Sequence, residues 1–136
     1  MKKILTIIIL SAIFTGCSST PKMSKDDIAW DNARTKYSPW EPVALSNSDE
    51  FHLIHPTSIK EVSPGVRRAW AKSTEDLSTM REWAINCYSE QIALGNSVDI
   101  SNNKIGATKK VNGSFTKVYP DTVGYSMVKY VCKKSI

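Results

Sequence analysis

The sequence predicts an α+β fold that combines short β-strands with a helix near each end of the domain. Residues 51–73 are rich in β-branched and aromatic side chains and are interrupted at Pro56 and at Pro64-Gly65, a pattern typical of short strands. Asn112-Gly113 lies between two further β-rich segments, which is a strong signal for a hairpin turn. Residues 120–134 repeat apolar side chains at helical spacing and therefore predict a C-terminal helix.

Residues 1–16 have the features of a bacterial signal peptide. Lys2 and Lys3 supply positive charge, and the apolar run that follows is too short to span a bilayer comfortably. The stretch that ends at Cys17 resembles the lipobox of bacterial lipoproteins. In that family the signal is cut before the cysteine, whose thiolate accepts a diacylglyceryl group. The resemblance implies that Cys17 carries lipid; an ordinary cleaved signal and an uncleaved anchor helix are the alternatives.

The residues after Cys17 indicate where such a lipoprotein would reside. Ser18 and Ser19 stand where enterobacterial lipoproteins of the inner membrane carry Asp, so the resemblance implies the outer membrane, with the covalent lipid as the membrane contact. Residues 17–25 are small, polar and charged, and predict a tether. Residues 26–136 then form a single domain. Without residues 1–16 the chain has 16 basic and 13 acidic residues, and a net charge of +3 is weak evidence for an anionic partner.

A short helix is predicted over residues 26–36. Ser24 and Asp27 have the spacing of a capping box, which satisfies backbone N–H groups at the start of a helix. Pro39 follows and ends the helix, because proline lacks an N–H donor and clashes with the preceding turn.

Residues 74–94 have two interpretations. Ser73 and Asp76 have capping-box spacing, and apolar residues then recur at helical intervals at Leu77, Met80, Ala84 and Cys87. The same segment also alternates as a strand does, at Trp83, Ile85 and Cys87, with a second segment beyond it. The periodicity alone slightly favours a helix.

The last third of the chain predicts turns and a helix. Both positions of a tight turn favour positive φ, which suits Asn112-Gly113, so a hairpin is expected there. Asn102-Asn103 marks a second turn. Pro120 suits the first turn of the C-terminal helix. The apolar face of this helix comprises Val123, Met127, Tyr130 and Val131.

Three cysteines are present, and their number bears on disulfide formation. If Cys17 carries lipid, Cys87 and Cys132 remain, and an even number in an exported protein predicts a disulfide in the oxidising periplasm. A bond that closes a loop of this size stabilises by ~4 kcal/mol in the chain-entropy description. Two buried free thiols are the alternative.

Several short stretches resemble the surface-adhesin protein E family of small Gram-negative lipoproteins. The resemblance covers roughly residues 40–133 and rests on the stretches "SIKEV", "VRRAWAK", "EWAINCYSEQIAL", "KIG" and "VYPDTVGYSMVKYVC". It implies a single antiparallel β-sheet with a C-terminal helix that the Cys87–Cys132 disulfide fastens to one face. It also implies that residues 74–94 form strands, and we adopt this interpretation.

Catalysis, cofactors and metals are not predicted. His52 and His55 are three positions apart, so on a strand they face opposite sides of the sheet and cannot hold one metal ion. No Gly-x-Ser-x-Gly elbow and no glycine-rich phosphate loop is present. Nucleic acid is an improbable partner for a lipid-anchored exported domain.

Two basic clusters are candidates for a binding surface. The first comprises Arg67, Arg68, Lys72 and Arg81, and the second comprises Lys104, Lys109, Lys110 and Lys117. They would contact an anionic protein, glycan or lipid headgroup. The favoured alternative is that these charges keep exposed strand edges from pairing with neighbouring molecules.

The predicted function is that of an outer-membrane-anchored, non-catalytic binding module. Members of the resembled family include adhesins for host matrix and serum proteins such as vitronectin and laminin, and relatives can form homodimers through the sheet. A periplasm-facing structural or envelope-maintenance lipoprotein is one alternative. An exclusion or inhibitor lipoprotein of a mobile element is another.

Overall fold

The computed structural model describes residues 23–102 and 104–136. The predicted signal peptide (1–16), Cys17 and most of the predicted tether lie outside these residues. Along the chain the elements are α1 (Lys25–Tyr37), β1 (Glu41–Leu45), β2 (Phe51–Ile54), the 3₁₀ helix η1 (Pro56–Ser58), β3 (Lys60–Ser63), β4 (Val66–Ser73), β5 (Thr79–Asn86), β6 (Gln91–Ser101), β7 (Lys104–Lys109), β8 (Thr116–Lys117) and α2 (Val123–Lys133).

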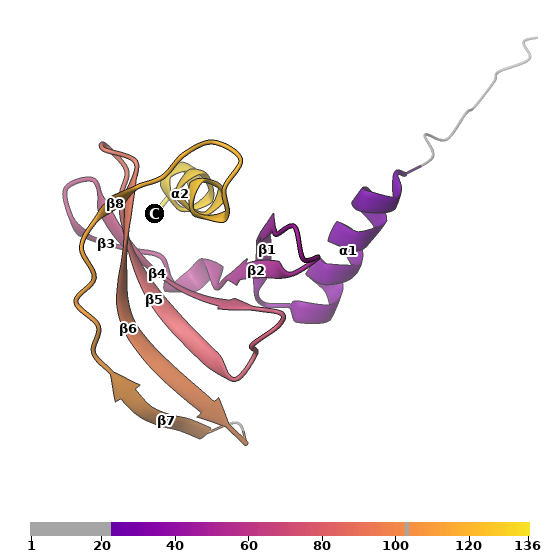
Figure 1. The fold of residues 1–136 in the computed structure, drawn as a ribbon, viewed down its shortest axis with the longest axis horizontal. Coiled ribbons are helices and arrows are strands. Elements are labelled where there is room, and N and C mark those ends of the chain that lie inside the picture. Colours follow the sequence, from indigo (N-terminus) through magenta and orange to yellow (C-terminus); the bar gives the residue numbers. More distant parts are fainter. Residues whose placement is uncertain (1–22, 103) are drawn as a thin grey trace, which may run out of the picture.

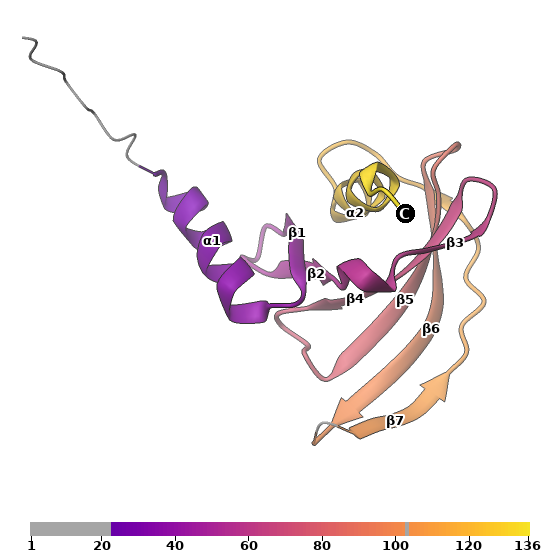
Figure 2. The ribbon, with the colours of Figure 1, turned by 180° about the vertical axis from the view of Figure 1, so that it is seen from behind.

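The strands form one antiparallel sheet whose neighbours follow one another along the chain. The main path is β1-β2-β4-β5-β6-β7. Strands β2 and β3 pair with opposite halves of β4, so they form one line that is interrupted at Pro56. Strands β7 and β8 pair in the same way with opposite halves of β6. The fold is therefore a meander, and the sheet curves around α2 (Figures 1 and 2).

Helix α2 packs its apolar face against the sheet. Met127, Val128 and Val131 are buried in one cluster with sheet residues that include Ala69 and Ile85. Cys87 directly follows β5 and forms a disulfide with Cys132 of α2. The predicted α+β fold is thus confirmed: a single antiparallel sheet carries a C-terminal helix that a disulfide links to the strand region. Val128, which the sequence interpretation omitted from the apolar face, is 1 % exposed.

Helix α1 packs at the β1 edge of the sheet and confirms the first predicted helix. The Ser24 hydroxyl accepts a hydrogen bond from the backbone of Asp27, whose carboxylate in turn accepts from Ser24, so the capping box is present. The Asp27 carboxylate accepts from the Ser24 hydroxyl and from the Ser24 backbone N–H, and these two bonds, the hydroxyl bond first, lower the pKa of Asp27. The Trp30 ring meets the Phe51 ring edge-on, with centroids 5.1 Å apart, and this contact joins α1 to β2.

Residues 74–94 form strands β5 and β6 and the turns beside them, so the strand interpretation is confirmed. The backbone N–H of Asp76 does donate to Ser73 Oγ at 3.1 Å, but this bond shapes the turn between β4 and β5 and starts no helix. The helical spacing arises because neither face of β5 is fully exposed. Met80 and Ala84 on one face and Trp83 and Ile85 on the other are all at least half-buried, so apolar residues occupy successive positions.

The hairpin predicted at Asn112-Gly113 is wrong. Neither residue has positive φ, and the chain continues along β6, with Gly113 N–H donating to the Leu94 carbonyl at 2.9 Å. A Cβ at Gly113 would lie 2.7 Å from the Leu94 carbonyl oxygen, so close backbone approach, not a turn, requires glycine here. Of the turn predicted at Asn102-Asn103, Asn103 lies outside the described residues, but Asn102 has a φ of 50° between β6 and β7, which confirms a turn there.

The expected start of the C-terminal helix is also wrong. Helix α2 begins at Val123, and Pro120 lies before its N-cap residue, Thr122. Thr122 Oγ1 accepts a hydrogen bond from the backbone of Tyr125 at 3.2 Å. Asp121, between Pro120 and the cap, has a φ of 62°, which no helical residue adopts. A side-chain cap therefore starts this helix, although the pattern favoured proline.

Candidate functional site

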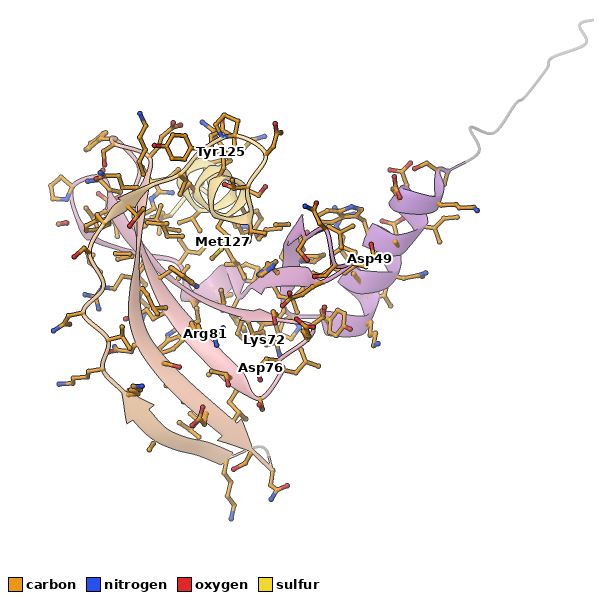
Figure 3. All side chains as sticks on the ribbon, viewed as in Figure 1. Asp49, Lys72, Asp76, Arg81, Tyr125 and Met127 are labelled. Carbon is orange, nitrogen blue, oxygen red and sulfur yellow. A yellow bond between two sulfur atoms is a disulfide. The ribbon has the colours of Figure 1, made fainter. Side chains whose placement is uncertain are left out.

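A groove with a volume of ≈ 160 Å³ lies between the N-terminal half of α2 and the sheet. Its lining comes from strands β2, β4, β5 and β6 and from α2, and comprises His52, Ala71, Lys72, Arg81, Trp83, Ile92, Val123, Gly124 and Met127. Most of these side chains are apolar, and the three polar ones are all basic. Figure 3 shows Met127 on the sheet-facing side of α2, with Arg81 and Lys72 below it on the strands.

Arg81 lies in a row of side chains that crosses the sheet. In the pairing register Arg81 is opposite Ala71 on β4 and Ser97 on β6, and Ser97 is opposite Lys109 on β7. Residues paired in this way point to the same face of a sheet, and strands are spaced about 4.8 Å apart. Arg81 and Lys109 therefore share one face at a separation of about 10 Å between their backbones.

The guanidinium of Arg81 has no partner in the described part of the chain. It forms no ion pair within 4.0 Å and donates no hydrogen bond there. The charge of Arg81 does act on one carboxylate, that of Asp76. The pKa of Asp76 is lowered first by the hydrogen bond from Ser78 and least by Arg81. Arg81 therefore presents a cation at the groove whose N–H donors are unused among the described residues, with Asp76 as a more distant anion.

The other two basic side chains of the groove already have partners. The Lys72 ammonium lies 4.3 Å from the centre of the Trp40 ring, a cation–π contact, and burial lowers the pKa of Lys72. His52 Nε2 lies 3.9 Å from the Glu50 carboxylate. Arg81 is consequently the groove cation that remains available to a bound molecule.

Arg67 is engaged by the C-terminal end of α2. Its Nη1 donates to the carbonyl oxygens of Val131 at 2.7 Å and Lys134 at 2.7 Å, and to Cys132 at 3.3 Å. The last carbonyls of a helix lack intrahelical donors and carry partial negative charge, so a cation is favourable there. Only 17 % of the Arg67 side chain is exposed. The sequence contained no local signal for this contact, which joins residues 64 or more positions apart.

Arg68 lies on the opposite face of the sheet, because successive strand residues alternate. Its Nη1 donates to Glu82 Oε1 at 3.1 Å, and Asn96 donates to the same carboxylate oxygen. A second hollow of ≈ 350 Å³ on this face includes Arg68, Trp70 and Glu82 in its lining. Lys60 also lines this hollow, but Arg68 is already paired and the Glu82 carboxylate is part of the lining. An incoming anion would therefore meet an acidic group here, which the lining of the groove lacks.

The second predicted cluster lies along the outer edge of the sheet. Lys109 is the last residue of β7 and Lys110 follows it, and both are exposed. Lys104 and Lys117 are also exposed, on β7 and β8. In the region covered by the structure none of the four forms an ion pair. The eight basic residues of the two predicted clusters are therefore not brought together. Arg81 and Lys109 share a row, and Lys72 also lines the groove. Arg68 lies on the opposite face, Arg67 lies beneath the end of α2, and the outer edge carries Lys104, Lys110 and Lys117.

The two histidines occupy separate places, since His52 is in β2 whereas His55 follows that strand and precedes η1. His52 lines the groove, whereas His55 Nδ1 lies 2.9 Å from Thr57 Oγ1 and its ring meets Trp40 at a centroid distance of 5.0 Å. Within residues 23–102 and 104–136, no three His, Cys, Asp or Glu side chains are grouped so that they could hold a metal ion.

The groove itself was not predicted from the sequence. Trp83, Val123 and Met127 were assigned only to packing, and Arg81 only to a basic cluster. The alternation of Arg81 with Trp83 places both on one face, and this was the available signal. The opposite wall comes from α2, about 40 positions further along the chain, and no local pattern connects the two.

Comparisons with protein-family models, curated proteins and solved structures found no match to this chain. The resemblance to the surface-adhesin protein E family therefore stays a prediction from the sequence. Among the described residues, no helix combines the length and the apolar character needed to cross a bilayer.

Proposed function

We propose that this chain is an outer-membrane lipoprotein, anchored through lipid on Cys17, whose domain is a non-catalytic binding module. The observation that carries the proposal is the disulfide between Cys87 and Cys132. Because the sequence contains three cysteines, this bond leaves Cys17 as the remaining thiol. That cysteine directly follows the apolar stretch that resembles a lipoprotein signal.

The binding role is supported by the surfaces of the domain. The groove beside α2 combines apolar side chains with the unpartnered cation of Arg81. Pockets lined mainly by apolar groups with a few convergent polar ones are the usual form of a ligand site. The exposed lysines of β7 and β8 form a further charged surface. Adhesion to a host matrix or serum protein is the form of binding that the family resemblance implies.

The anchor is tested by mass spectrometry of the full chain purified from bacterial membranes. We expect acyl groups on the peptide that begins at Cys17, and loss of those groups in Cys17→Ala. A Cys87→Ser, Cys132→Ser double variant is the matched control and should keep its acyl groups. An unacylated Cys17 in the native protein would overturn the anchored lipoprotein.

Exposure of the domain is tested by adding protease to intact cells. Cleavage of the domain supports a host-facing binding module. Protection that lasts until the outer membrane is opened excludes a host adhesin and supports the alternative of a periplasm-facing lipoprotein with a partner inside the envelope. An abundant periplasmic protein, which must stay intact, controls for leakage.

A further inference from the structure

The groove between α2 and the sheet has the size and chemistry of a site for one small molecule. Its volume of ≈ 160 Å³ is comparable to a protein cavity of about 150 Å³ that accommodates a benzene ring. A polymer or a folded partner would need a larger surface than this, so the groove is a small-molecule site separate from any surface that binds a host protein. The occupant that fits is therefore a single ring or a short branched chain.

The apolar part of the groove is shared between the helix and the sheet. Trp83 and Ile92 contribute from the strands, and Val123 and Met127 contribute from α2. Trp83 and Val123 are only partly buried, although both pack against the buried core. Their remaining apolar surface is in contact with water until a ligand covers it, which favours an apolar ligand group.

The basic side chains of the groove favour an anionic ligand. No acidic residue is among its lining side chains, while Arg81, Lys72 and His52 are. Lys72 is held over the Trp40 ring and His52 lies near Glu50, so the guanidinium of Arg81 is the free group. A guanidinium binds carboxylate and phosphate groups through paired hydrogen bonds. Lys109, in the same row of the sheet, adds to the positive potential.

We propose that this groove binds a small organic anion, with its ring or branched chain between Trp83 and α2 and its carboxylate or phosphate on Arg81. The inference rests on the proposed function, because it assigns a ligand class to the binding module. It concerns reversible binding only, and no bond is made or broken.

The experiment uses the full chain in phosphatidylcholine nanodiscs, with para-fluorophenyl phosphate as the probe and fluorine NMR as the readout. We expect saturable broadening of the probe signal that empty nanodiscs do not give. Arg81→Gln should weaken binding about tenfold, since it removes one charge-assisted pair, and Arg81→Lys should weaken it less. Lys110→Gln makes the same change of charge at an exposed position away from the groove and should bind as the native chain does. Val123→Phe, which fills the groove, should abolish binding.

Each contrary result overturns a defined part of the inference. If native protein shows no saturation, or if Arg81→Gln binds normally, the groove is not an anion site. If para-fluorobenzyl alcohol binds equally well, charge is irrelevant, and if inorganic phosphate competes as strongly as the probe, the apolar wall is irrelevant. The acyl mass on Cys17, measured on the same preparation, reports separately on the proposed function. If the protein does not enter nanodiscs, the proposed lipid anchor is contradicted, and binding of the probe to the groove is then measured in buffer.

Discussion

Arg67 and Arg68 illustrate how neighbouring residues of one strand acquire different roles. The sequence gives both the same charge and places both in one basic cluster. Alternation along β4 directs them to opposite faces, so Arg67 lies under the end of α2 and Arg68 pairs with Glu82. That at least one of them faces outward was predictable. Which of the two would bind another part of the fold was not predictable, because the carbonyl groups that Arg67 binds lie near the C-terminal end of the sequence.

We expect Arg67→Gln to destabilise the protein by about 2 kcal/mol, because hydrogen bonds to a charged donor are worth roughly 1.5–3 kcal/mol and their loss strands half-buried carbonyls. Urea unfolding of the disulfide-intact protein measures this. Arg68→Gln is the matched control and should cost about 1 kcal/mol or less, since 49 % of the Arg68 side chain is exposed. Equal losses in the two variants would contradict the assignment of Arg67 to the end of α2.

At the scale of elements, the sheet edge after β6 is where sequence patterns were least informative. The capping box of α1, the strands between residues 51 and 73, the turn at Asn102 and the apolar face of α2 were all predicted, because each depends on residues close together in the chain. Asn112-Gly113 also has a strong local pattern. Strand β6 nevertheless pairs with β7 and β8 at its two ends, and between them Gly113 donates to Leu94, so contacts with β6 override the turn.

This correction leads to a test with two substitutions. Gly113→Ala should destabilise by about 1–3 kcal/mol, since the new methyl group meets the backbone of Leu94 and forces the edge to shift. Asn112→Ala should have almost no effect, because Asn112 is exposed and lacks positive φ. Thermal unfolding of both variants provides the measurement. A hairpin turn predicts a substantial loss for Asn112→Ala as well, and that result would contradict the contact of this segment with β6.

The turn between β4 and β5 should make stability depend on acid pH. Hydrogen bonds, chiefly from Ser78 at 2.7 Å, lower the pKa of Asp76 below its ordinary value of 3.8. A carboxyl group with a lowered folded-state pKa contributes stability that is fully present above 3.8 and is lost as the pH falls through the folded value. We therefore expect the stability difference between native protein and Asp76→Asn to shrink on acidification below 3.8. Urea titrations at several pH values test this, and a constant difference would contradict it.

Across the whole molecule, charge is distributed unevenly. Residues 23–99 carry eight basic and twelve acidic side chains, whereas residues 100–136 carry seven lysines and one aspartate. The first group includes α1, which packs at the β1 edge and continues to the predicted tether, and the second forms the β7 edge and α2 (Figure 1). The positive β7 edge thus lies across the sheet from the β1 edge that α1 covers, and it favours approach of an anionic partner.

The disulfide is the covalent connection between the sheet region and α2, and its removal should affect the entire fold. Cys87 and Cys132 are 45 positions apart, and releasing a loop of this length costs ~4 kcal/mol in the chain-entropy description. We expect urea unfolding in the presence of reductant to show about this loss. Cys132→Ser should show the same loss without reductant, and reductant should then have no further effect. Undiminished stability after reduction would contradict a structural role for the bond.

The strand order also bears on how quickly the fold can form. Most neighbouring strands in the sheet also follow one another along the chain, and shorter sequence separation between contacting residues favours faster folding. Helix α2 is the exception, since its partners on β1, β4 and β5 lie far back in the sequence. We therefore expect the strands to pair before α2 docks on the sheet, and the disulfide of Cys132 to form last.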